Sequence, residues 1–93
     1  MPLYTASDWV DIGHGVSIQK RYRDGSLLEG GVAYRHPHPK TGVTCEGWVS
    51  FRPKWADAWD LLAEEPLTMS PSLLCRACGH HGFIENGKWR PCP

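Results

Sequence analysis

Alternating apolar and polar positions run through much of the chain and predict short strands. Val16–Tyr22 alternates as a half-buried strand does, and Val43–Phe51 also looks like a strand. After a turn at Arg23–Ser26, Leu27–Glu29 and Val32–Tyr34 are expected to form the returning strand, with a bulge at the two glycines between them. The pattern therefore predicts a hairpin followed by a further strand.

Residues Pro53–Glu65 fit two patterns. A helix would place three apolar side chains on one face, at i, i+4 and i+7: Trp55, Trp59 and Leu62. The acidic pair Glu64-Glu65 is unfavourable at the end of a helix, because the carbonyl end carries partial negative charge. The alternative is a strand at Trp59–Ala63, a turn, and a strand at Leu67–Met69. Both readings stay open.

The C-terminal segment predicts a second hairpin. Asn86-Gly87 is the strongest short signal for a two-residue type I′ turn. The turn pairs Glu85 with Lys88, and the same register continues to His81 opposite Cys92. The proline before Cys92 weakens this last pairing, since proline donates no ladder hydrogen bond.

Just before the hairpin, Cys75-x2-Cys78-Gly79 has the form of a zinc knuckle. Two thiolates at this spacing can reach one tetrahedral ion at Zn–S distances of about 2.3 Å. Gly79 suits the positive φ that folds the chain back over the metal. Together with the hairpin register, this predicts a self-contained Cys3His zinc site: Cys75, Cys78, His81 and Cys92.

A competing site would take its fourth ligand from the middle of the chain and join distant segments. The candidates there are His36, His38 and Cys45. The run 36–42 contains Pro37 and Pro39, so it is expected to be an irregular, extended loop that presents two imidazoles.

The cysteines also allow other chemistry. Four cysteines could form two disulfides in a secreted protein, or remain inert core thiols. A redox Cys-x-x-Cys is favoured by a strand before it and a helix after it. Here Pro71 precedes the motif and a glycine and a hairpin follow. His80 is expected to be a solvated neighbour of the site.

The short length of the chain favours the metal hypothesis, because a small core benefits from additional stabilisation. A chain of 93 residues is expected to form one domain, residues 1–93, that buries only about 60–65% of its unfolded surface. Zinc binding in small fingers contributes about 10–16 kcal/mol, which is comparable to the stability of a whole domain. The expected fold is α+β and mostly β: a small domain of antiparallel hairpins with a ribbon-like C-terminal zinc site.

Charge and composition narrow the classes of partner. The formal net charge is zero, which disfavours a nonspecific nucleic-acid binder. Five tryptophans suit a small core and a protein-binding surface. The first residues lack the basic start and apolar run of a signal peptide, and no apolar stretch is long enough for a membrane helix. A cytoplasmic location is therefore expected, where thiols stay reduced and favour metal binding.

The tail from Pro66 to Trp89 resembles an uncharacterised family of small actinobacterial and mycobacteriophage proteins, whose pattern is roughly PLTLSPSLLC-x2-CG-x-HGFI-x2-GRW. The resemblance covers the last third of the chain and places Cys75, Cys78 and His81 on recurrent positions. Many of these proteins lack a cysteine at the position of Cys92, which implies a fourth ligand from the middle of the chain. The resemblance also favours the strand at Leu67–Met69 and implies a bacteriophage origin, but no activity.

These observations lead to one main expectation about function. The chain is expected to be a non-enzymatic protein with structural Zn²⁺ that binds a protein partner, such as a bacterial host factor. The alternative is a zinc-ribbon nucleic-acid binder that uses basic and aromatic side chains of the tail: Arg76, Lys88, Trp89 and Arg90. A metalloenzyme needs an open metal position and a nearby carboxylate base, and Glu85 lies on the hairpin. This class is disfavoured because neither an HExxH motif nor a deaminase-type motif is present.

Overall fold

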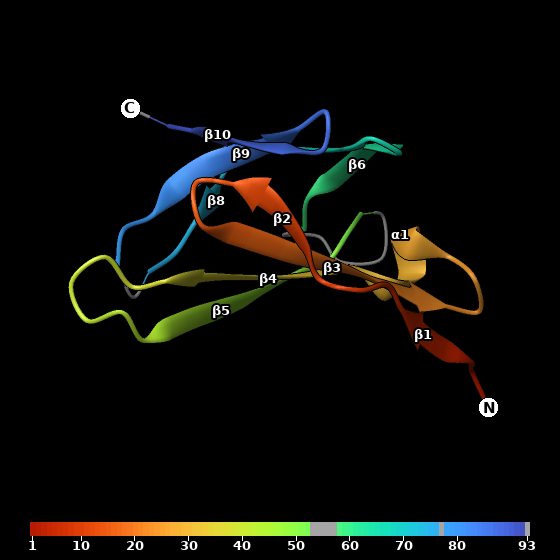
Figure 1. Cartoon of the computed structure of the whole chain (residues 1–93). Helices are drawn as coiled ribbons and strands as arrows, with labels where there is room; N and C mark the ends of the chain where they lie inside the picture. Colours follow the sequence, from red (N-terminus) through yellow and green to blue (C-terminus); the bar gives the residue numbers. More distant parts are fainter. Residues whose placement is uncertain (53–57, 77, 93) are drawn as a thin grey trace.

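The computed structural model describes residues 1–52, 58–76 and 78–92, which form mostly antiparallel strands (Figure 1). The largest sheet has β3 and β4 at its centre and β5 along one edge. Two short strands, β1 and β2, pair with successive parts of β3 along the other edge. Their bounds are Tyr4–Ala6 for β1, Val10–Gly13 for β2, Val16–Arg23 for β3, Val32–Pro37 for β4 and Thr44–Val49 for β5.

Two smaller sheets lie over the same face of this five-stranded sheet (Figure 1). One contains β8, β9 and β10 in the order β10-β9-β8, and the other pairs β6 with β7. Their bounds are Asp60–Glu64 for β6, Leu67–Ser70 for β7, Leu73–Leu74 for β8, His81–Glu85 for β9 and Lys88–Pro91 for β10. The described part of the chain contains no helix that could span a membrane.

The alternation along β3 explains which face is covered. Val16 and Ile18 are buried, whereas the residues between and after them are partly exposed. The register continues this face across the sheet, since Ile18 lies opposite Tyr34 in β4. Apolar residues from all three sheets meet between the layers, among them Val32, Val49, Leu67, Met69, Leu73 and Ile84. Burying each such side chain contributes about 1.5–3 kcal/mol.

The predicted hairpin is correct in β3 and β4 but wrong between them. Leu27–Glu29 is not a strand, because Leu27–Gly30 forms a single helical turn, α1. The Ser26 side chain caps this turn by accepting the Glu29 amide at 3.3 Å. Leu27 is buried in the core, and Gly31, at φ 95°, lets the chain leave the helix and enter β4.

The expected irregular loop begins later than predicted. His36 and Pro37 are the last residues of β4, opposite Cys45 and Thr44 of β5. Pro37 is tolerated because the pairing of β4 with β3 ends at Arg35, so no strand on that side needs the missing amide. The strand predicted at Val43–Phe51 is confirmed as β5.

The strand alternative for residues 59–69 is correct. β6 and β7 pair across the turn at Glu65-Pro66, and Leu61 packs against the core. The helix is wrong for residues 60–64, whose burial alternates with period two. Trp55, part of the proposed helical face, lies outside the described residues.

The C-terminal hairpin has the predicted register. Lys88 lies opposite Glu85, and the pairing continues to Pro91 opposite Gly82. Asn86 and Gly87 have φ values of 50° and 73°, as a type I′ turn requires. The Gly87 amide donates to the Leu67 carbonyl at 2.8 Å, which fixes the turn against β7.

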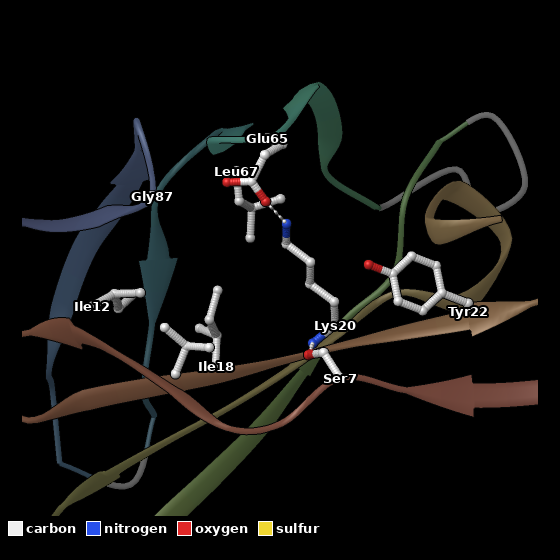
Figure 2. A pocket seen from close by; sticks show the side chains of 9 residues that line it. Ser7, Ile12, Ile18, Lys20, Tyr22, Glu65, Leu67 and Gly87 are labelled. Carbon is white, nitrogen blue, oxygen red and sulfur yellow. Dashed lines mark hydrogen bonds and ion pairs between the residues drawn. The ribbon is translucent and has the colours of Figure 1, made fainter. Parts of the chain in front are cut away.

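A cleft of about 340 Å³ separates β3 from the β6–β7 turn (Figure 2). Lys20 crosses it, and its ammonium donates to the Glu65 carboxylate at 3.0 Å and to the Glu64 carbonyl at 2.7 Å. The neighbouring walls include buried Ile12, Ile18 and Leu67. Because the ammonium already has two acceptors, Lys20 is best described as a tie between the layers.

Candidate metal centre

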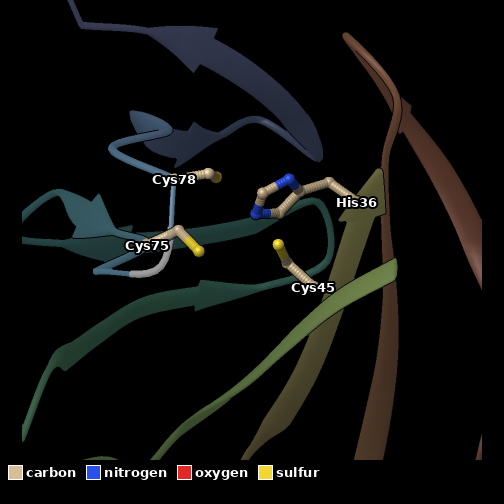
Figure 3. A group of neighbouring side chains, drawn as sticks. All are labelled: His36, Cys45, Cys75 and Cys78. Carbon is tan, nitrogen blue, oxygen red and sulfur yellow. The ribbon is translucent and has the colours of Figure 1, made fainter. Parts of the chain in front are cut away.

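Three thiols and one imidazole meet near the end of β4 (Figure 3). His36, Cys45, Cys75 and Cys78 each offer one ligand atom, and these atoms all lie within 4.8 Å of one another. Figure 3 shows the sulfur-bearing side chains pointing toward the His36 ring from separate segments of the chain. These four residues, called the Cys3His cluster below, lie close enough to hold a metal ion.

Strand pairing positions the first two members of the cluster. His36 and Cys45 are direct partners in the antiparallel β4–β5 ladder, so their side chains lie on the same face. That face carries buried Val32 and Val49 further along the two strands. The connecting loop is closed by the His38 amide, which donates to the Val43 carbonyl at 2.8 Å.

A tight turn between β8 and β9 positions the other two members. The Gly79 amide donates to the Cys75 carbonyl at 2.7 Å, and the Cys75 amide donates to the His80 carbonyl at 2.8 Å. Gly79 has φ 77°, as the sequence predicted for a knuckle that folds back on itself. The turn brings Cys75 and Cys78 to one point beside β4 and β5.

His36 has the clearest signature of a ligand. It is 2% exposed and is the one buried polar or charged side chain among the described residues. Its Nδ1 lies 3.2 Å from the Pro37 carbonyl, a geometry in which Nδ1–H donates and Nε2 carries the lone pair. Nε2 is buried without a hydrogen-bond partner. A buried orphan nitrogen costs about 1–3 kcal/mol, and a metal bond removes that cost.

The thiols are crowded in a way that disfavours three negative charges unless a cation is present. Burial, together with hydrogen bonding and charge repulsion from the Cys75 and Cys78 sulfurs, raises the pKa of the Cys45 thiol to about 11. Burial, followed by the charges of the three cysteines, also raises the pKa of Tyr34. A bound divalent cation reverses this balance, because it stabilises thiolates directly.

His80 is not the solvated neighbour that the sequence predicted. Its ring stacks between those of His36 and Trp89, with centroid distances of 4.4 Å and 4.9 Å. Burial, and then the charges of His36 and His14, lower the pKa of His80. The uncharged ring therefore packs beside the cluster and shields one side of His36.

Two of the four predicted ligands, Cys75 and Cys78, belong to the cluster, whereas His81 and Cys92 do not. The Cys92 amide donates to the His81 carbonyl at 3.0 Å, so the predicted pairing holds for the backbone. Gly82 and Ile84 are buried on one face of β9, and alternation places His81 on the other. His81 Nε2 lies 2.7 Å from Ser72 Oγ.

Two of the three alternative ligands from the middle of the chain lie in the cluster, and one does not. His36 and Cys45 belong to the cluster, while His38 stays in the loop. There, His38 Nδ1 accepts the Lys40 amide at 3.1 Å and closes the turn. Pairing of two strands places His36 opposite Cys45. The sequence did not predict this pairing, because Pro37 and Pro39 indicated an irregular loop at His36.

The structure also bears on two alternatives: a catalytic Glu85 carboxylate and disulfide bonds between the cysteines. Glu85 accepts two hydrogen bonds from Arg90, at 2.9 Å each, and these bonds lower the pKa of its carboxyl. Cys45, Cys78 and Cys92 are thiols outside any disulfide, which leaves no pair of cysteines bridged.

All the contacts described for the site lie within this chain. Comparison of the chain with models of protein families, with curated proteins and with solved structures found no match.

Proposed function

We propose that the chain binds one Zn²⁺ ion through the Cys3His cluster and that this ion is structural. The observation that carries the proposal is the convergence of three sulfurs with a buried, unpartnered imidazole nitrogen. Zinc bonds of about 2.0–2.3 Å in a tetrahedron put ligand atoms about 3.3–3.8 Å apart. Ligand atoms that already lie within 4.8 Å of one another need only small side-chain shifts to reach that geometry.

Zinc is the ion that fits this donor set best. Thiolate and imidazole ligands in a tetrahedral arrangement suit zinc, whereas magnesium and calcium prefer oxygen ligands. Four protein ligands fill the coordination sphere and leave no open position for water or substrate. The ion would then join the β4–β5 pair to the C-terminal knuckle, two segments far apart in sequence.

We further propose that the protein is a non-enzymatic module that binds another protein. A closed metal site and a Glu85 carboxylate held by Arg90 offer no evident catalytic group. Several large apolar side chains are more than 40% exposed, as at protein-binding surfaces: Leu3, Tyr4, Val10, Val43, Trp48, Leu62 and Leu74. The resemblance of the tail to phage proteins points to a host factor in the bacterial cytoplasm as the partner.

The nucleic-acid alternative finds less support on the C-terminal hairpin. Trp89, its proposed stacking residue, is 5% exposed, and Arg90 is paired with Glu85. Arg76 and Lys88 remain exposed, but two cations are a weak basis for binding phosphates.

Metal content and stability should change together. Protein purified without added chelator is expected to contain one zinc per chain, and a strong chelator should abolish its cooperative melting because the staple is lost. Elemental analysis and circular dichroism measure the two quantities on one sample. Metal-free protein that melts as sharply and at the same temperature as untreated protein would overturn the structural role.

A further inference from the structure

One face of the five-stranded sheet is not covered by any element of the described chain. β6 to β10 all lie over the opposite face (Figure 1). Strand alternation places Arg21, Arg35 and Trp48 on the uncovered side, because their neighbours Tyr22, Tyr34 and Val49 face the core. We propose that this outer face docks an acidic segment of a partner protein, an inference that rests on the proposed protein-binding function.

Two arginine–tryptophan stacks organise the outer face. The Arg35 guanidinium carbon lies 4.0 Å from the centroid of the Trp9 ring, and that of Arg21 lies 5.3 Å from Trp48. Small residues on the central strands leave room for these stacks: Ser17 lies opposite Arg35, and Ala33 lies opposite Trp48. Stacking fixes both guanidinium groups before any partner arrives, which reduces the entropy lost on docking.

A shallow hollow of about 360 Å³ lies beside the stacks. Its lining combines aromatic, charged and small residues: Trp9, Tyr34, Trp48, Arg21, Glu46, Ala33 and Gly47. Its volume is near the lower limit for small-molecule pockets, so it suits a side chain from a partner. Exposed Trp and Arg around such a hollow are the residues that most often dominate the binding energy of protein interfaces.

The charges of the face determine the chemistry of the partner. Arg21, Arg23 and Arg35 have no carboxylate partner among the described residues, and Arg21 Nε donates to the neutral Gln19 side chain. Carboxylates are fewer on this face. The Asp11 carboxylate accepts a hydrogen bond from the Gly13 amide, two residues further on, at 2.8 Å. A partner that covers these guanidinium groups must supply anionic acceptors, since burying them unpaired is costly.

An acidic protein segment fits this face better than a nucleic acid. Glu46 in the edge strand β5 lies directly opposite Arg35, so a continuous run of phosphates that covers Arg35 would meet a carboxylate. The net charge of the whole chain is zero, which provides little long-range attraction for a polyanion. Separate carboxylates on a peptide can reach Arg21 and Arg35 and avoid Glu46.

Peptide selection on the zinc-loaded protein tests the proposal. A library of random peptides is selected against the wild-type protein, and the best binder is synthesised and titrated. We expect enrichment of Asp and Glu, with affinity falling about tenfold or more for Arg21→Gln and Arg35→Gln. Lys88→Gln removes a positive charge from the distant hairpin and should leave the affinity unchanged.

Several results would overturn the outer-face proposal. One is that the selected peptides show no enrichment of Asp and Glu. Another is that the best binder has the same affinity for Arg21→Gln and Arg35→Gln as for the wild-type protein. Salt-sensitive binding of an oligothymidylate that is lost in both variants would assign the face to nucleic acid instead. Zinc content is measured on the same samples, so a fully zinc-loaded wild-type protein that selects no peptide rejects the outer face and leaves the metal proposal standing.

Discussion

Cys75→Ser is expected to lose the metal and to unfold the domain. The variant keeps the size of the side chain but removes one of three thiolates from the Cys3His cluster. Apparent zinc-binding energies of about 10–16 kcal/mol equal or exceed the 5–15 kcal/mol that stabilise a typical domain, so a weakened site leaves little net stability. Circular dichroism should show loss of cooperative melting, and elemental analysis should show loss of zinc.

Cys92→Ser is the matched control, because Cys92 is a half-exposed thiol outside the cluster. It should keep its zinc and melt close to the wild-type temperature. If Cys75→Ser retains a wild-type melt, the metal is not what holds the fold. If both serine variants unfold equally, Cys92 belongs to the site after all.

Exchanging histidines separates the two proposed ligand sets. His36→Gln removes the imidazole of the cluster and should weaken zinc binding by about a hundredfold or more, since even residues that only support ligands cost 10–100-fold. His81→Gln loses a hydrogen bond with Ser72, worth about 1 kcal/mol, and should keep its affinity for zinc. Competition with a chromophoric chelator measures both affinities.

The reverse order of sensitivity would contradict the cluster. A His81→Gln protein that loses zinc, beside a His36→Gln protein that keeps it, would restore the self-contained site of Cys75, Cys78, His81 and Cys92. Melting curves recorded at saturating zinc check that neither glutamine variant fails to fold for an unrelated reason.

The features that sequence analysis predicted correctly depend on local signals. Asn86-Gly87 fixes a type I′ turn whose register follows by counting, and all four residue pairs of β9 and β10 obey it. Gly79 follows the second cysteine of the knuckle and has the expected positive φ. Strand β3 follows from simple alternation, because one of its faces is buried.

The features that it missed depend on tertiary contacts or on short signals that compete. The pairing of His36 with Cys45 requires the register of β4 and β5, and the prolines near His36 concealed that register. The turn α1 is capped by Ser26, three positions before Glu29, but two leucines and a Gly-Gly pair resembled a bulged strand. Strand β6 carries a helix-like spacing that its pairing with β7 overrides.

At the candidate site, too, local spacing identified some residues, whereas others depend on tertiary packing. Spacing identifies Cys75 and Cys78, since two residues between cysteines suffice to form a knuckle. The other two members of the cluster come from another sheet, and which imidazole reaches the sulfurs depends on how the sheets pack. His81 is nearer in sequence, but it lies on the face of β9 opposite to buried Gly82 and Ile84.

X-ray absorption at the zinc edge tests the central claim most directly, because it reports the atoms bound to the ion in the folded protein. The Cys3His cluster predicts three sulfur neighbours at about 2.3 Å and one nitrogen neighbour at about 2.0–2.1 Å. In the His36→Gln protein the imidazole signal should disappear while the sulfur signal remains. A wild-type spectrum dominated by oxygen neighbours, or an imidazole signal that survives in His36→Gln, would contradict the account.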